Sequence, residues 1–220
     1  PELGIQGFDA YEGLYADSKK WLRDGTVDYF VPQLYWETAR RPQSFPVLLE
    51  WWKSQNIKKR HVWPGLAAYR IGSNENWSAG ELLNQIALTR GSAETRGAVH
   101  FSFKSLRNDL GGVQQALTDG PYKRDALIPI SPWIKAPRPA SPRVSIVRGN
   151  ELVNVNWTER GKRKAFWYVV YAKDKEGWSY SILPAGERAI SLSADRQIEE
   201  ILVTSVDRLG NESSPRRIIL

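Results

Sequence analysis

The chain has 220 residues, of which 41% are hydrophobic and 25% charged, with a formal net charge of +7. This composition is typical of a globular protein of one or two domains, and no run approaches the roughly 18 apolar residues of a membrane-spanning helix. The absence of cysteine excludes disulfides, thiolate metal sites and cysteine nucleophiles. Lys and Arg are scattered among Asp and Glu along the sequence, so we interpret the positive charge as mostly solvated surface and expect no nucleic-acid partner.

The first 37 residues predict a helix followed by a strand. Asp9 and Glu12 have the spacing of a capping box, apolar residues recur at helical spacing, and Gly25 supplies a stop signal. A helix over residues 10–24 follows from this pattern. Residues 27–37 then form an apolar strand whose far end turns polar, aromatic and acidic. Ligands of α/β proteins gather at that end of a strand.

Two more helix and strand pairs follow in the chain. Ser44, with Pro46 in the first turn, opens a helix whose predicted buried side holds Val47, Leu48, Trp51 and Trp52. A strand is expected over 61–69. Ser78 and Glu81 form a second capping box, Gly91 ends that helix, and residues 97–103 read as a third strand. The alternation predicts parallel strands covered by helices.

The character of the sequence changes at residues 128–142, which hold five prolines and cannot continue a helix or a central strand. Only short strand-like runs separated by turn signals come after it. We therefore divide the chain into an α/β part over 1–127, a proline-rich linker over 128–142 and an all-β part over 143–220.

A (β/α)₈ barrel is the natural architecture for the α/β part, but such a barrel needs about 250 residues. Residues 1–127 hold about three of the eight strands, which alone would leave two sheet edges and half a core exposed. The chain also opens on Pro1 and carries no leader sequence. We expect it to be the C-terminal portion of a TIM-type barrel that a longer protein completes.

Several segments of the α/β part resemble the bacterial glycosyl-hydrolase-like family ten. They are residues 7–17, 21–29, 63–66, 97–103 and, most specifically, Pro32-Gln33-Leu34-Tyr35-Trp36. The resemblance covers roughly residues 5–125 and implies a (β/α)₈ barrel linked to cell-wall glycans. The family's acidic motif of two aspartates followed by Tyr-Phe, expected on an earlier strand, does not occur in this sequence.

The all-β part resembles a fibronectin type III module. Residues 154–157 are similar to its early strand with the core Trp157, residues 167–172 to its central strand, and residues 202–213 to the strand and turn near its end. Ile201 stands where such modules usually carry a corner tyrosine, so that hydrogen bond is expected to be absent. The resemblance implies a β-sandwich that serves as a spacer or a docking surface.

Strand alternation selects the side chains expected to reach the barrel axis. The predicted polar cluster consists of Gln33, Tyr35, Tyr69, Ser102 and Lys104, with His100 beside Ser102 on the same face of the last strand. Sugars require aromatic faces for stacking and fixed donors and acceptors for their hydroxyls. Trp36, and Trp77 in the loop after the second strand, are the candidates for stacking, against the alternative that both are packing residues.

Glycoside hydrolysis ordinarily uses two carboxyl groups. Glu37, just past the end of the first strand, is the catalytic candidate, and Glu75 is second. The alternative for Glu37 is an exposed loop acid beside Arg40 and Arg41. We expect the main catalytic carboxylates to lie on upstream barrel strands, so that this chain alone is inactive.

The sequence thus predicts a fragment of a glycoside hydrolase-like protein acting on bacterial cell-wall or other polysaccharide glycans, in an extracytoplasmic location. The rival interpretations are a non-catalytic carbohydrate-binding or scaffold protein and a purely structural adhesion domain. No cofactor and no metal are expected, because the two histidines, His61 and His100, are too few and too separated for a His-rich site. The expected partners are a peptidoglycan-type glycan or another polysaccharide and the missing N-terminal barrel portion.

Overall fold

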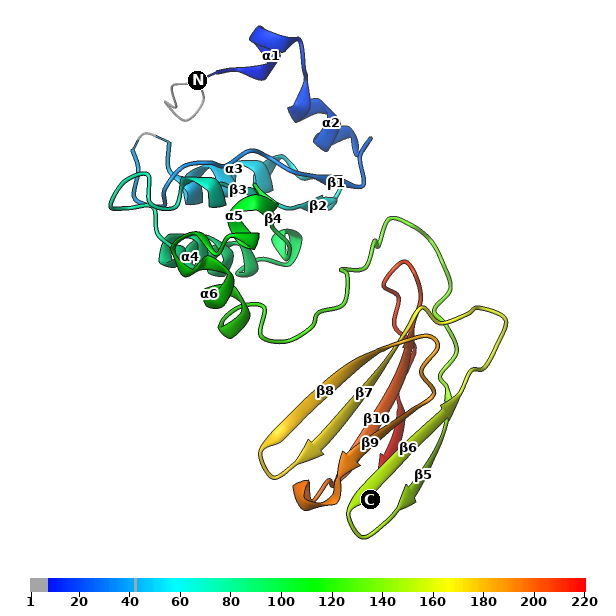
Figure 1. The fold of residues 1–220 in the computed structure, drawn as a ribbon. Coiled ribbons are helices and arrows are strands. Elements are labelled where there is room, and N and C mark those ends of the chain that lie inside the picture. The colour runs from blue at the N-terminus through cyan, green and yellow to red at the C-terminus, as the bar shows by residue number, and fades with distance from the viewer. Residues whose placement is uncertain (1–7, 42) are drawn as a thin grey trace. The chain divides into compact units, whose positions relative to one another are not determined.

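The computed structural model describes residues 8–41 and 43–220, so Gly7 of the first resemblance segment lies outside the described residues. It divides into two compact units, Pro1–Arg124 and Asp125–Leu220. The first unit mixes helices with short parallel strands, and the second is built of antiparallel sheets (Figure 1). Within the described residues, every helix is too short or too polar to cross a bilayer.

The single helix predicted over residues 10–24 is wrong, because the structure has two helices, α1 (Ala10–Leu14) and α2 (Ser18–Asp24). Tyr15 takes a left-handed conformation with φ of 54° and ends α1. Asp17 then caps α2 by accepting a hydrogen bond from a backbone amide one turn later. Gly25, with φ of 70°, ends α2 as the sequence predicts.

Three parallel chain segments form the framework of the first unit. Its strands are β1 (Tyr29–Phe30), β2 (His61–Val62), β3 (Gly65–Leu66) and β4 (Val99–His100). β1 pairs with β2 and β3 pairs with β4, both in parallel, and a bridge from Gln33 to Gly65 joins the two pairs. The predicted strands over 27–37, 61–69 and 97–103 therefore exist, but each is shorter than predicted.

Helices cover one face of these strands. They are α3 (Phe45–Gln55), α4 (Ala79–Arg90), α5 (Phe103–Arg107) and α6 (Val113–Asp119), with 3₁₀ turns η1 (Ala68–Arg70), η2 (Ala93–Thr95) and η3 (Leu110–Gly112) between them. Leu34 and Leu66 of the strand segments share one buried cluster with residues of α3, α4 and α6. In α3 the fully buried side chains are Phe45 and Leu49, whereas Val47 is 44% exposed, which corrects the predicted buried side.

The opposite face of the strands is open and apolar. Tyr29, Val31, Val99 and Phe101, which alternate with the buried strand residues, are between 37% and 55% exposed. The rings of Tyr29 and Trp63 stack on this face with their centroids 4.9 Å apart. Exposed apolar surface of this kind is typical of a site that contacts another layer or a partner.

The second unit has two antiparallel sheets. One sheet has the order β5 (Arg143–Arg148), β6 (Leu152–Thr158), β9 (Ala189–Ser193), and the other has β11 (Arg216–Ile219), β10 (Glu200–Val206), β7 (Trp167–Asp174), β8 (Gly177–Pro184); a 3₁₀ turn, η4 (Ala194–Arg196), follows β9. Trp157 of β6 and Tyr168 of β7 meet in one core, with ring centroids 5.6 Å apart. The two sheets therefore form a β-sandwich (Figure 1).

The three segments singled out in the all-β part become β6, β7 and β10. Trp157 is 2% exposed, as expected for a core residue. Ile201, at the position where fibronectin type III modules usually carry the corner tyrosine, is fully buried and apolar. After β10, Asp207 organises the turn by accepting backbone hydrogen bonds from Leu209 and Asn211. Gly210 in this turn has φ of 78°, a conformation that favours glycine.

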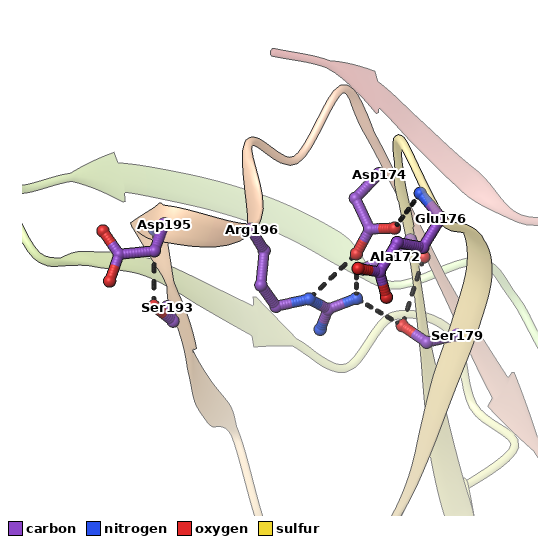
Figure 2. Close-up of polar contacts among 7 residues, drawn as sticks. All are labelled: Ala172, Asp174, Glu176, Ser179, Ser193, Asp195 and Arg196. Atoms are coloured by element: carbon purple, nitrogen blue, oxygen red, sulfur yellow. Dashed lines mark hydrogen bonds and ion pairs between the residues drawn. The ribbon is translucent and has the colours of Figure 1, made fainter.

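A partly buried ion pair joins the β7–β8 hairpin to η4. Arg196 donates from Nε and Nη2 to Oδ2 of Asp174, at 2.9 and 2.6 Å, and from Nη2 to Oγ of Ser179 at 2.7 Å (Figure 2). Asp174 is 8% exposed. The hydrogen bond from Arg196 holds the pKa of Asp174 below its usual value.

The proline-rich stretch is hydrogen-bonded along the second unit. The carbonyl of Ala140 accepts from Oγ of Ser205 at 2.7 Å, and Oγ of Ser141 donates to the carbonyl of Ser214 at 2.6 Å. Further upstream, the hydroxyl of Tyr180 donates to the carbonyl of Asp125 at 2.7 Å. Residues 125–142 thus pack with the sandwich.

Candidate functional site

Three aromatic rings gather where the parallel strand segments end. Tyr35 follows β1, Tyr69 lies in η1 after β3, and Phe101 follows β4. Each pair of these rings has centroids 5.9 Å apart, with Tyr35 stacked on Phe101 and Tyr69 edge-on to both. Tyr69 is 49% exposed and Phe101 55%. We call these three residues the aromatic wall.

Gly65 makes room for the wall from inside the strands. A methyl group at Gly65 would stand 3.2 Å from Cε1 of Tyr35 and 3.3 Å from the carbonyl oxygen of Pro32. The glycine therefore lets the Tyr35 ring lie directly on the neighbouring strand. Burial, together with the nearby Tyr69, raises the pKa of Tyr35, so its hydroxyl remains a proton donor at neutral pH.

Arg70 supports the wall from behind. Its Nη1 donates to the carbonyl of Tyr35 at 2.9 Å, and its guanidinium stands 5.2 Å from the centre of the Trp77 ring. Trp77 itself is 2% exposed and belongs to the core of the first unit. The expectation that Trp77 stacks on a sugar is therefore wrong, because its ring offers no face to a ligand.

Glu37 is a buried acid. It is 9% exposed, and its Oε1 accepts a hydrogen bond from Nδ2 of Asn74 at 3.0 Å. Asn74 comes from the loop after η1, so this contact ties together the ends of two neighbouring strand segments. The alternative interpretation of Glu37 as an exposed loop acid is contradicted. Trp36, just before it, is partly buried and accepts from Nε2 of Gln85 through its carbonyl at 3.1 Å.

The loop beyond Glu37 is anchored to α4. Glu81 accepts from the backbone amide of Thr38 at 2.7 Å and from its hydroxyl at 2.9 Å. The amide of Glu81 meanwhile bonds to Oγ of Ser78, which caps α4 as predicted. The carboxylate of Glu81 thus accepts two hydrogen bonds from Thr38, and a third from Nε2 of Gln85 at 2.8 Å.

The predicted polar cluster is assembled only in part. Gln33 is exposed on the same face as the aromatic wall. Ser102 and Lys104 do not continue the last strand, because Ser102 is the residue before α5 and Lys104 lies within that helix, exposed. His100 faces the other way, with its Nε2 2.7 Å from the hydroxyl of Tyr122.

The alternation predicted for the last strand is therefore inverted. Phe101, expected to pack against helices, belongs to the aromatic wall, and His100, expected toward the axis, is on the helix side. Burial lowers the pKa of His100, which keeps its ring neutral. Phe101 and Arg70 are the two site residues that the sequence did not reveal. The signal that could have identified Phe101 is its position at the carboxyl end of a strand, where Tyr35 and Tyr69 also lie.

The described residues contain no group of three or more His, Asp or Glu side chains arranged to hold a metal ion. The chemistry available at the strand ends is that of phenol and amide groups, aromatic faces and one buried carboxyl group. Such a set binds and orients a polyhydroxylated ligand better than it transfers protons.

Comparison with known proteins identifies relatives of the chain. Residues 3–80 match the family model described as glycosyl hydrolase-like 10. The chain is 32% identical over 225 aligned residues to glycosyl hydrolase YngK of Bacillus subtilis, covering 94% of this chain and 44% of that protein. It is 30% identical over 105 residues to glycosyl hydrolase DigH of Escherichia coli K12, covering 44% of this chain and 24% of that protein. The chain thus spans less than half the length of these relatives.

Solved structures give weaker likenesses. The spore cortex lytic enzyme SleM of Clostridium perfringens aligns with 80% of this chain and 74% of its own, at 16% identity and a TM-score of 0.33. A fibronectin type III domain of human collagen XX aligns with 40% of this chain and 100% of its own, at 13% identity and a TM-score of 0.31. These scores are too low to assign a fold. The sequence matches confirm the resemblance found in the α/β part: residues 3–80 match the glycosyl hydrolase-like 10 family model, and YngK is similar over 94% of the chain.

Proposed function

We propose that this chain is the C-terminal portion of a (β/α)₈ glycoside hydrolase followed by a fibronectin type III-like module. The complete protein acts on bacterial cell-wall or other polysaccharide glycans outside the cytoplasm. The observation that carries the proposal is the aromatic wall of Tyr35, Tyr69 and Phe101, which stands open at the ends of three parallel strands. In barrel enzymes this end of the strands holds the active site.

The open apolar face supports the barrel interpretation. In a closed barrel the strand face opposite the helices points to the axis and is covered by the remaining strands. Tyr29, Val31 and Val99 occupy that face here and are 55%, 37% and 41% exposed. An N-terminal barrel portion would cover them, which agrees with the 44% of YngK that the chain spans.

Within the proposed site, different groups provide aromatic stacking and hydrogen bonding. The aromatic wall offers ring faces to a pyranose, while Gln33 and the Tyr35 hydroxyl offer donors and acceptors to its hydroxyls. Lys104 and Ser102, on α5 and just before it, and Trp36, between Tyr35 and Glu37 in the sequence, are further candidates for sugar contacts. Glu37 is the acidic candidate in this chain, and the principal carboxylates belong to the barrel strands outside it.

The test of the wall is glycan binding by the full-length protein. Phe101→Ala and Tyr69→Ala are expected to weaken the binding of a purified peptidoglycan-derived oligosaccharide by about tenfold each in calorimetry, since one stacking contact is worth about 1–2 kcal/mol. Tyr11→Ala, which removes a 58% exposed tyrosine from α1, is the matched control and should bind normally. Unchanged affinity in both wall variants would refute the proposal.

A non-catalytic carbohydrate-binding protein is the second candidate, and the buried position of Glu37 favours it. An acid that is 9% exposed and bonded to Asn74 is well placed to hold a loop. Turnover of glycan by the full-length protein decides between the two candidates, because a non-catalytic binding protein has none. Glu37→Gln is expected to lower turnover by less than 100-fold, because general acid or base catalysis contributes about 10²- to 10⁴-fold and the proposal assigns it to other carboxylates. A larger loss with normal binding would make Glu37 the catalytic group.

A further inference from the structure

The sandwich unit contains a basic hollow between the edges of its two sheets. Arg143 is the first residue of β5 and Arg216 the first of β11, and these two strands are the edge strands of their sheets. Arg160, from the loop after β6, completes the arrangement. These arginines line one hollow of about 690 Å³ together with Ser141, Pro142, Val144 and Pro215.

The three guanidinium groups have no counter-ion within the described part of the chain. All three residues are exposed, and the ion pairs and side-chain hydrogen bonds found there involve other arginines. Arg163, from the same loop as Arg160, is neutralised by Asp207 at 2.8 Å. The neighbouring Glu159 turns its Oε1 to the backbone amide of Ala165 at 2.7 Å. The hollow thus keeps its positive charge.

The hollow is also held in shape by its own backbone. The hydroxyl of Ser141 donates to the carbonyl of Ser214, which fixes the segment before β5 beside the segment before β11. The hydroxyl of Ser205 in β10 donates to the carbonyl of Ala140 and holds the same segment against β10. A methyl group on Gly161 would stand 3.2 Å from Cβ of Ala140, which places the loop of Arg160 against the same segment. The arginines therefore project from a fixed rim.

We propose that this hollow binds phosphate groups carried on a sugar or polyol chain. Guanidinium groups match phosphate oxygens with paired, charge-assisted hydrogen bonds. The apolar part of the lining, Pro142, Val144 and Pro215, suits the carbon skeleton between successive phosphates. The lining lacks an aromatic side chain on which a nucleic-acid base could stack, and three arginines around one hollow differ from the long basic groove that follows a nucleic-acid backbone. The site is independent of the aromatic wall.

The experiment is calorimetric titration of the full-length protein with a synthetic glycerol phosphate hexamer, alongside glycerol 3-phosphate and inorganic phosphate. The hexamer is expected to bind at least tenfold more tightly than either small phosphate, since several phosphates contact the rim at once. Equal affinity for glycerol 3-phosphate would overturn the proposal that the hollow binds phosphates carried on a polymer. A single-stranded oligonucleotide or a polygalacturonate of equal charge that binds as tightly would overturn the phosphate and polyol specificity.

The variant Arg143→Gln/Arg216→Gln is expected to weaken hexamer binding at least tenfold, and Arg160→Gln alone at least threefold. The matched control Arg148→Gln/Lys175→Gln removes the same charge from the opposite end of β5 and from the β7–β8 turn. It should change the affinity by less than twofold. An equal loss in the control would show that the net charge of the chain, not the hollow, binds the polymer. Circular dichroism of each variant confirms that the sandwich is intact.

Discussion

Replacing Trp77 by alanine distinguishes two roles for this residue, packing in the core and stacking on a sugar. Trp77 is 2% exposed, lies in the same core as Leu82 and Ile86, and carries the guanidinium of Arg70 on its ring. Truncation of a buried aromatic side chain costs about 3–5 kcal/mol, against a total stability of about 5–15 kcal/mol for a domain. Phe101→Ala, at a side chain that is 55% exposed, should cost less than about 1 kcal/mol.

Urea denaturation followed by circular dichroism at 222 nm measures this difference. The α-helices all lie in the first unit of the described structure, so this signal reports mainly on that unit. With a slope of about 2 kcal/mol per molar urea, Trp77→Ala should lower the midpoint by about 1.5–2.5 M. Phe101→Ala should lower it by less than about 0.5 M while it weakens glycan binding by about tenfold. A Trp77→Ala protein of normal stability that fails to bind glycan would refute the assignment of Trp77 to the core.

Two further substitutions test the packing behind the wall and the sandwich. Gly65→Ala is expected to destabilise the first unit by about 1–3 kcal/mol and to weaken glycan binding, because the added methyl group displaces the Tyr35 ring. The control Gly80→Ala in α4 should stabilise this unit by up to about 1 kcal/mol. Equal urea midpoints for the two variants would contradict this prediction. Because the folded-state pKa of Asp174 is lowered, its ion pair with Arg196 stabilises the sandwich above about pH 4 and this stability is lost as pH falls through the lowered pKa. Asp174→Asn should therefore flatten the decline of the sandwich melting temperature between pH 6 and about pH 3, and a variant with the wild-type decline would argue against the pair.

The order of elements could be predicted because it rests on local signals. Caps at Ser78 and Asp9 and stops at Gly25 and Gly91 act within one turn of a helix, and each is present in the structure. The break at Tyr15 was missed because apolar spacing alone continues through it. A left-handed residue between two acidic caps is decided by local backbone geometry and not by the apolar pattern.

The site was harder to predict than the fold because it depends on which face of a strand is covered. The assumption that apolar residues face the helices fails along 99–103, because Val99 and Phe101 lie on the open face, and this inverts the predicted positions of Phe101 and His100. Trp77 does lie in the loop before α4, but packing against the core and under Arg70 buries its side chain, which chain position alone does not reveal. The basic hollow was invisible because Arg143, Arg160 and Arg216 are far apart in sequence and converge only when two sheet edges meet.

The two hydrogen bonds from Thr38 to Glu81 lower the entropy cost of ordering this loop when a ligand binds. A free loop must lose about 1–2 kcal/mol of conformational freedom for each residue that a ligand orders. Thr38 is already fixed through both its amide and its hydroxyl, and Glu37 beside it is fixed through Asn74. Under the proposed function, a glycan that contacts Trp36 beside the buried Glu37 would meet a segment ordered in advance, so its contacts count toward affinity with little entropic loss in the protein.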